Sequence, residues 1–273
     1  AAQVVLEKKL HGLFVKAKSI SRNVVYGGGV ALNCVANSKL KKEVAGEFWI
    51  MPNPGDAGGA LGAACLEWGS KVNWTDPYLG YDIVPSKPRR QLAKDVVKHL
   101  LKERMCGVAV GRAEYGPRAL GNRSILFQAT DITANDWLNK KLKRTEFMPF
   151  APITLLEYFN ECYENISKEL NTYQFMTITV NCSKKMKEQS PAVVHVDGTA
   201  RPQLVNKLNN PDLHEILSNY YKLSGIPSLI NTSFNPHEEP IVCSPEDALK
   251  AFIDCNLDYL QIGSFLIKAE HNR

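Results

Sequence analysis

No apolar run in the sequence reaches the length of about 18 residues that a membrane-spanning helix needs. Residues 1–19, AAQVVLEKKLHGLFVKAKS, interleave charged and apolar side chains at helical spacing, so they lack the apolar stretch of a signal peptide. These absences exclude a membrane-spanning class for the residues given. They predict a cytoplasmic protein with no membrane partner.

Sequence signatures of several enzyme classes are also missing. There is no Gly-x-Ser-x-Gly elbow, no His-Glu-x-x-His motif and no His-x-x-x-His pair, which removes the main support for a serine hydrolase or a zinc protease. The seven cysteines stand singly, without a Cys-x-x-Cys pair or a local Cys/His cluster. We therefore expect reduced core cysteines, as in cytosolic proteins.

A continuous basic face is lacking as well. The formal net charge is +5, but the basic residues are dispersed among acidic ones except in the run at 140–144. Such dispersal argues against a nucleic-acid-binding module, which needs a basic stripe with interleaved aromatic residues. Small ligands that carry phosphate suit this charge equally well.

Helix and strand signals alternate along the chain, which predicts an α/β fold with a mixed sheet. The segment at 69–90 is rich in proline, glycine and aspartate and has no sustained period, so it marks a boundary. We predict a first domain at 1–75, a linker at 76–90 and a second domain at 91–273. Among the expected strands of the second domain are the segments GVAVG, SILFQ, YQFMTITV, AVVHV, IPSLIN and YLQIGSFLI.

Two glycine-rich turns precede helices in the first domain. The segment YGGGVALNCVAN at 26–37 lets backbone N–H groups approach a phosphate or nucleoside, although a simple strand-to-helix turn explains it equally well. In NPGDAGGALG at 53–62, Asp56 begins a helix. Its carboxylate either caps that helix or coordinates a hard cation.

The densest cluster of charge is GRAEYGPRALGNRS at 111–124, a loop between two expected strands. It holds Arg112, Arg118 and Arg123 among glycines and a proline. Planar guanidiniums suit bidentate recognition of phosphate or carboxylate, and the small residues give tight backbone turns. We favour an anion site over a solvated loop, because solvated loops usually mix Lys, Glu and Ser.

Three further segments carry candidate ligands. Lys143 and Arg144 lie shortly before the apolar segment FMPFAPITLL. The segment at 195–201, HVDGTAR, gathers an imidazole, a carboxylate, a hydroxyl and a guanidinium, which form either a satisfied loop network or a proton-moving anion site. The segment NTSFN follows an apolar strand, at the strand end where α/β sheets bind ligands. Its candidate ligand residues are Asn231, Ser233 and Asn235.

Read together and in order, several motifs resemble the NodU-type carbamoyltransferase family: GGGVALNCVAN, GDAGGALGAA, GRAEYGPRALGNRSIL, RTEFMPFAP, HVDGTARPQ and NTSFNPHEEPIV. The resemblance implies the C-terminal piece of an actin/hexokinase-like domain followed by a YrdC-like mixed-sheet α/β domain. The YrdC-like domain is expected to form carbamoyl adenylate from carbamoyl phosphate and ATP with Mg²⁺. The other domain transfers the carbamoyl group to a hydroxyl-bearing small molecule.

The resemblance also implies roles for individual residues. The expected catalytic set comprises Arg118, Arg123, Lys143, Arg144, His195, Asp197 and Arg201. The expected cofactor-binding set comprises Gly27, Gly28, Gly29, Asn33, Asn231, Ser233 and Asn235, and Asp56 matches a metal-binding aspartate of the family.

The sequence departs from the family in one respect, because it contains no counterpart of the two metal-binding histidines. The resemblance therefore implies that Fe²⁺ or another divalent metal is bound by a complete first domain. The expected partner of this chain is a missing N-terminal half or a second copy of the chain. Two alternatives remain: a tRNA-binding YrdC-like module, and a catalytically silent subunit of a split carbamoyltransferase.

Overall fold

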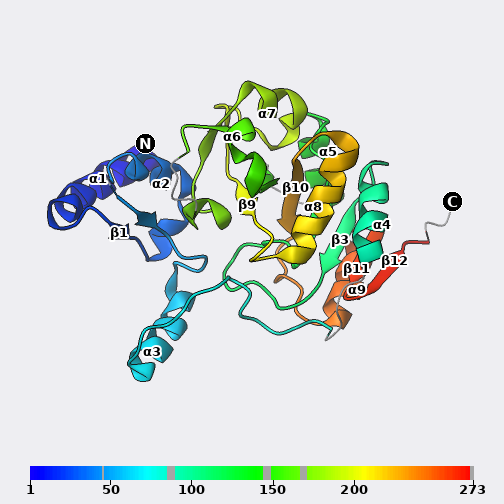
Figure 1. Cartoon of the computed structure of the whole chain (residues 1–273), viewed down its shortest axis with the longest axis horizontal. Coiled ribbons are helices and arrows are strands. Elements are labelled where there is room, and N and C mark those ends of the chain that lie inside the picture. The colour runs from blue at the N-terminus through cyan, green and yellow to red at the C-terminus, as the bar shows by residue number, and fades with distance from the viewer. Residues whose placement is uncertain (45, 85–89, 144–148, 167–170, 271–273) are drawn as a thin grey trace.

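The computed structural model describes residues 1–44, 46–84, 90–143, 149–166 and 171–270. Within these residues the chain forms two units (Figure 1). The first unit runs from the N-terminal helix α1 to α3 and has a small core of its own. The second unit runs from α4 to β12 and holds two larger clusters of buried side chains.

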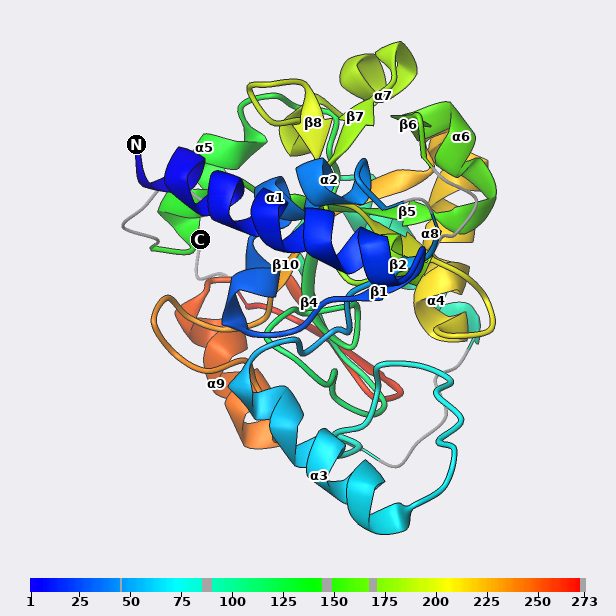
Figure 2. The same cartoon turned by 90° about the vertical axis from the view of Figure 1, so that its left-hand side faces the viewer.

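The first unit places two helices against a two-stranded parallel sheet. Its elements are α1 (Ala2–Ile20), β1 (Val24–Val25), η1 (Gly29–Leu32), α2 (Cys34–Lys41), β2 (Phe48–Trp49), η2 (Asp56–Gly58) and α3 (Gly59–Trp68). Helix α1 buries Leu10 and Phe14, which are four residues apart and so lie on one face. Figure 2 shows α1 lying alongside α2 and across the two strands.

Helix α3 contributes no buried side chain to the described structure. It projects away from the rest of the chain in Figure 1, although its sequence GALGAACLEW is mainly apolar. Leu66 and Trp68 are 84% and 72% exposed.

A seven-stranded mixed sheet forms the centre of the second unit, in the order β12-β11-β3-β4-β10-β5-β9. The β11/β3 and β5/β9 pairs are parallel and the other pairs antiparallel. The strands are β3 (Cys106–Ala109), β4 (Arg123–Phe127), β5 (Ala151–Leu155), β9 (Gln203–Val205), β10 (Ser228–Ser233), β11 (Tyr259–Ile262) and β12 (Phe265–Lys268).

Helices cover both faces of this sheet. Along β4, Ile125 and Phe127 enter one buried cluster and Leu126 enters the other, as expected when successive side chains point to opposite faces. Helices α5 (Ala134–Lys141) and α9 (Pro245–Asp254) supply the first cluster; α4 (Arg90–Leu100) and α8 (Pro211–Ser224) supply the second. The predicted α/β class with a mixed sheet is therefore confirmed.

A small three-stranded sheet, β6-β7-β8, and several short turns lie between β5 and β9 in the sequence. The elements are η3 (Leu156–Tyr158), α6 (Phe159–Cys162), β6 (Tyr163–Glu164), η4 (Asn171–Gln174), β7 (Val180–Cys182), α7 (Lys184–Gln189), η5 (Pro191–Val193) and β8 (Thr199–Ala200).

Two expected strands in this region are wrong. The segment YQFMTITV at 173–180 begins in η4 and joins a sheet only at its last residue. Met176 there has a φ of 58°, which breaks an extended backbone. The segment AVVHV at 192–196 starts in the 3-10 turn η5, because Pro191 at the first turn position presets a helical φ.

Other expectations from composition can be compared with the structure. Four of the seven cysteines, Cys106, Cys162, Cys182 and Cys255, are buried, as expected for core residues. No helix among the described residues combines the length and apolar character that a membrane crossing needs.

Candidate anion-binding site

Two arginines from separate segments meet at a cavity of about 70 Å³ at the end of β10. Arg118 comes from the loop between β3 and β4, and Arg201 lies between β8 and β9. The cavity is also lined by Phe150, Met176, Asn231, Thr232 and Ser233. Of the residues expected from sequence, the structure thus brings together Arg118, Arg201, Asn231 and Ser233.

The positive charge of this cavity is not neutralised within the described part of the chain. Neither guanidinium has a hydrogen bond or an ion pair there. Burial and the neighbouring Arg201 cation lower the pKa of Arg118 to about 10. A guanidinium whose charged form is disfavoured in this way gains the most from a bound anion, because the anion offsets both the burial and the repulsion.

Glu114, which the sequence reasoning did not select, organises the loop that carries Arg118. Its Oε1 atom accepts hydrogen bonds from the backbone N–H groups of Leu120 at 2.7 Å, Asn122 at 2.8 Å and Arg123 at 3.1 Å. Burial raises the pKa of Glu114. Its position as the one acidic residue of an arginine-rich loop is the sequence feature that could have identified it. Its buried carboxylate stabilises the turn by accepting these backbone hydrogen bonds.

Arg123 does not line the cavity and has a structural position instead. Its side chain is fully buried and donates to the carbonyls of Val110, Asn122, Tyr81 and Gly111 at 2.8 to 3.2 Å. With both terminal nitrogens bonded to backbone carbonyls, the guanidinium has no free terminal nitrogen to offer a ligand in this conformation. In this conformation Arg123 holds backbone carbonyls, and the anion-binding role that the motif suggested stays a prediction.

Arg112, the third arginine of the loop, is exposed and also bonds to backbone. Its Nε donates to Gly80 O at 3.0 Å and its Nη2 donates to Leu79 O at 2.9 Å. These bonds tie the expected linker onto the second unit. Tyr78 reinforces the attachment by donating from its hydroxyl to Leu120 O at 2.9 Å.

Polar side chains lie at the end of β10 and just beyond it. Asn231 and Ser233 line the cavity. Asn235, two residues further on, donates from Nδ2 to the carbonyls of Pro236 at 3.0 Å and Glu239 at 2.7 Å, while its Oδ1 is buried without a partner. Asn235 therefore shapes the turn after the strand and is not itself a lining residue.

The HVDGTAR segment divides between two places. Arg201 reaches the cavity, whereas His195 and Asp197 close a turn: His195 Nδ1 lies 3.0 Å from Thr199 Oγ1, and Asp197 Oδ1 accepts from that hydroxyl at 2.7 Å. Burial lowers the pKa of His195, and the Thr199 hydrogen bonds lower the pKa of Asp197. Asp197 lines a different cleft of about 240 Å³ beside α2. The catalytic roles expected for both residues stay predictions.

Of the two basic residues expected before the apolar PFAP segment, Lys143 is not among the residues that line the cavity. Lys143 is exposed and has a φ of 54°. Arg144 lies outside the described residues. The expected part of either side chain in ligand binding therefore stays a prediction.

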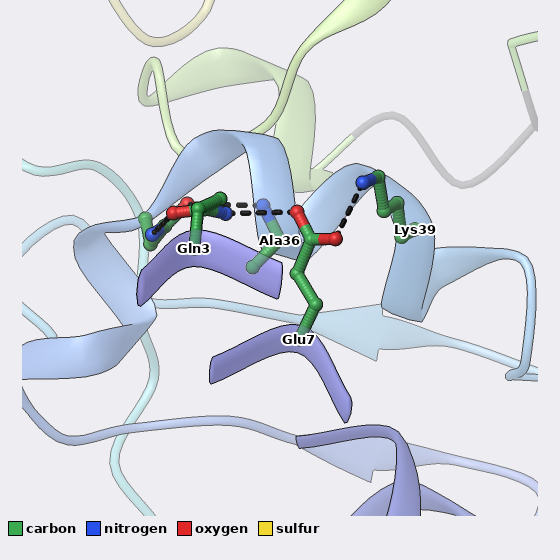
Figure 3. Close-up of polar contacts among 5 residues, drawn as sticks. Gln3, Glu7, Ala36 and Lys39 are labelled. Carbon is green, nitrogen blue, oxygen red and sulfur yellow. Dashed lines mark hydrogen bonds and ion pairs between the residues drawn. The ribbon is translucent and has the colours of Figure 1, made fainter. Parts of the chain in front are cut away.

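In the first unit, Asn33 serves as the N-cap of α2. Its Oδ1 accepts from Ala36 N at 3.0 Å, and its Nδ2 donates to Gln3 Oε1 at 2.8 Å. Gln3 in turn donates to Glu7, which pairs with Lys39 of α2 (Figure 3). The amide of Asn33 thus holds α1 against α2, which is the ordinary capping role of asparagine.

The glycine turn before α2 is partly open. Gly28 has a φ of 98° and donates its N–H to Pro54 O at 2.7 Å, and no atom lies within 4 Å of a side chain added at Gly28 or Gly29. Gly27 faces only Pro54 O at 3.8 Å. The open space beside these glycines is compatible with the expected nucleotide contact, which stays a prediction.

Asp56 begins η2 on an exposed part of the first unit. It makes no side-chain cap, and among the described residues no three His, Cys, Asp or Glu side chains are grouped to hold a metal ion. The donors around Asp56 within the described chain therefore do not make up a metal site, and its metal-binding role stays a prediction.

The two units share a buried polar contact next to the cavity. Asn37 of α2 is fully buried and donates from Nδ2 to Ala31 O and to Thr177 O, both at 2.7 Å. Ser38 Oγ lies in hydrogen-bond contact with Thr179 Oγ1 and accepts from Thr179 N at 2.9 Å. Because Thr177 follows the cavity residue Met176, this contact positions one wall of the site.

We expect Asn37→Ala to lower the free energy of unfolding by about 1–3 kcal/mol, because two buried carbonyls lose their donor. Urea unfolding followed by circular dichroism measures the change. Asn181→Ala, at an exposed position of β7, is the matched control and should change stability little. An unchanged midpoint for Asn37→Ala would show that the two carbonyls find other donors.

A larger cleft of about 710 Å³ lies at the opposite end of the sheet. It is lined by His99, Arg104, Asp258 and Tyr259 among others. Tyr259 pairs with Cys106 at the start of β3. Ser233 pairs with Ser124 of β4, which in turn pairs with Val108 near the other end of β3. This cleft is therefore remote from the arginine pair. Within it, Arg104 Nη1 lies 3.6 Å from Asp258 Oδ1, so this arginine has an acidic partner.

The second unit is thus an α/β unit with two arginines at a cavity near a strand end, and neither arginine has an acidic partner among the described residues. Two family models then identify the class: Carbamoyltransferase C-terminus matches residues 97–269 and Carbamoyltransferase N-terminus matches residues 1–65. The chain belongs to the carbamoyltransferase family, which confirms the resemblance read from the motifs. The division of the chain at 75 and 91 remains a prediction.

Curated relatives agree with this family. The chain is 34% identical, over 90% of its length, to an uncharacterised protein of Methanocaldococcus jannaschii, of which it covers 44%. It is 36% identical, over 88% of its length, to the nodulation protein NolNO of Sinorhizobium fredii, of which it covers 39%. The chain thus spans less than half the length of these two relatives.

Solved structures offer a more distant likeness. A crystal structure of full-length HypF in the phosphate- and nucleotide-bound form is 18% identical, with a TM-score of 0.46, over 62% of this chain and 20% of that chain. A likeness of this extent carries no argument about the site.

Proposed function

We propose that this chain forms carbamoyl adenylate from carbamoyl phosphate and ATP, as part of an ATP-dependent O-carbamoyltransferase of the EC 2.1.3 type. The observation that supports this most is the pair of guanidiniums, Arg118 and Arg201, that line a small cavity without any described partner. In a carbamoyltransferase, a phosphate-bearing carbamoyl donor is the anion that such a cavity would hold.

The two arginines grip the phosphate of carbamoyl phosphate by charge-assisted hydrogen bonds. Hydrolysis of this mixed anhydride, in which water breaks the bond between the carbamoyl group and the phosphate, gives carbamate and inorganic phosphate. A carbamate oxygen then forms a bond to the α-phosphorus of ATP as the bond to pyrophosphate breaks, which yields carbamoyl adenylate. Fixed cations stabilise the charge that builds at the phosphorus, and Mg²⁺ bound with ATP neutralises the triphosphate.

Transfer of the carbamoyl group to a hydroxyl-bearing small molecule belongs, in this proposal, to a first domain completed by further residues or by a second subunit. Two observations support this. The chain covers only 44% and 39% of two curated relatives, and α3 buries none of its mainly apolar side chains. Leu13 and Val5 of α1 are also largely exposed, at 62% and 58%. The metal that the resemblance implies, Fe²⁺ or another divalent ion, would belong to that completed domain.

Exchange of labelled pyrophosphate into ATP tests the proposal on the purified chain. We expect exchange that requires both carbamoyl phosphate and Mg²⁺. Absence of exchange together with absence of carbamoyl phosphate binding would overturn the proposal in favour of a silent subunit. Binding of tRNA at low salt, measured on filters, would instead favour the nucleic-acid module, which the dispersed charge argues against.

A further inference from the structure

Asn231 lines the arginine cavity with an amide group whose orientation is fixed by its neighbours. Its Nδ2 donates to Ala119 O at 3.0 Å and to Gln203 Oε1 at 2.9 Å. Its Oδ1 is buried and accepts no hydrogen bond from any described residue. The side chain is only 1% exposed, so water does not readily satisfy this oxygen.

Gln203 prevents the alternative orientation of the amide. Its own Nε2 donates to Leu120 O at 2.6 Å, which fixes its Oε1 as the acceptor that faces Asn231. If the Asn231 amide rotated by half a turn, its oxygen would face two acceptors, Ala119 O and Gln203 Oε1. The network therefore sets the oxygen of Asn231 as an acceptor held ready for a donor.

An unpaired buried acceptor beside an anion-binding pair selects for a particular ligand. Carbamoyl phosphate and acetyl phosphate share the phosphate and the carbonyl group, but the first ends in an NH₂ group and the second in a methyl group. Only the NH₂ group donates a hydrogen bond. A site that offers a buried acceptor rejects the analogue without the donor, because the acceptor then stays unpaired.

We propose that Asn231 is the residue that distinguishes carbamoyl phosphate from other acyl phosphates, by accepting a hydrogen bond from the carbamoyl NH₂ group through Oδ1. Arg118 and Arg201 hold the phosphate, and Gln203 positions the amide of Asn231. This inference rests on the proposed function, since it assigns selectivity to the same cavity. It adds a reason why the donor is a carbamoyl group.

The test compares displacement of labelled inorganic phosphate by carbamoyl phosphate and by acetyl phosphate. For the unmodified chain we expect carbamoyl phosphate to bind roughly tenfold to hundredfold more tightly, which is the usual effect of an unpaired buried polar group. Asn231→Ala should lower this ratio to within about threefold while affinity for inorganic phosphate changes little. Asn181→Ala is the control that should keep the full ratio.

Asn231→Ala also leaves Ala119 O and Gln203 Oε1 without their donor, so its fold is checked by thermal melting. If that variant does not fold, Gln203→Met serves in its place, because it removes the acceptor that sets the amide orientation, and the ratio should again fall. Equal affinity for the two acyl phosphates in the unmodified chain overturns the inference, as does an unchanged ratio in a folded variant. Absence of binding by both acyl phosphates and by inorganic phosphate points instead to failure of the proposed function.

Discussion

Arg118→Met is expected to make the unliganded chain more stable, by about 1 kcal/mol, and to remove most of its affinity for carbamoyl phosphate. Burial and the Arg201 cation hold the pKa of Arg118 near 10, below its ordinary value of 12.5. The folded state therefore carries a charge that it disfavours. A methionine fills similar space without that charge, but it offers no hydrogen bond to phosphate.

The sign of the effect follows from this pKa. A base with a lowered folded pKa destabilises the fold fully below that pKa, and the penalty fades as pH rises from about 10 to 12.5. At pH 7 the measured free energy of unfolding therefore includes the whole cost of burying the charged Arg118. Affinity for carbamoyl phosphate should fall by roughly 10- to 100-fold when the charge-assisted bonds are lost.

Thermal melting with and without carbamoyl phosphate measures both consequences. The unmodified chain should gain about 2.7 kcal/mol of stability when the ligand is at 100 times its dissociation constant, and Arg118→Met should gain far less. Arg22→Met, at an exposed position outside the cavity, is the control and should leave the gain intact. An Arg118→Met variant that is less stable than the parent would show that the side chain stabilises the apo fold.

Gly116→Ala is expected to lower the free energy of unfolding by about 2–4 kcal/mol and to weaken phosphate binding. Gly116 has a φ of 135°, a conformation that side chains disfavour. A Cβ atom there would lie 2.5 Å from Pro52 O, which is backbone and cannot move aside easily. Relief of this clash must shift the loop that carries Arg118, two residues further along.

Urea unfolding and displacement of labelled phosphate measure the two effects of Gly116→Ala. Gly12→Ala in α1 is the control, because nothing lies within 4 Å of a side chain added there and alanine favours a helix. The control should match or exceed the parent in stability. A Gly116→Ala chain that retains parental stability and phosphate affinity would show that the two units do not need this close approach.

Sequence reasoning proposed Arg118, Asn231 and Ser233 as ligand residues because residue chemistry agreed with loop composition or strand position there. Arg118 lies in a loop built from small residues, and Asn231 and Ser233 lie at the end of an apolar strand, so both point to a ligand without knowledge of the fold. Arg123 shows where such reasoning ends. Its residue type and motif match those of Arg118, and only the packing of four backbone carbonyls around it decides that it is structural.

The strand expected at 173–180 fails for a related reason. An alternating apolar pattern predicts a half-buried strand, but Thr172 donates to Phe48 O and Thr177 O accepts from Asn37, both in the first unit. The polar groups of this segment are thus satisfied by a neighbour that is distant in sequence, and no sheet is needed. Local periodicity carries no information about that neighbour.

The contact between Asn37 and Thr177 has a consequence for how the chain is divided. The linker at 76–90 looks like a natural place to separate an adenylate-forming module from the rest. Yet Met176 in the cavity wall adjoins a carbonyl that α2 holds in place, so the cavity is the joint product of both sides of that boundary. We therefore expect that exchanging one unit for that of a relative, without its partner, would displace a wall of the cavity.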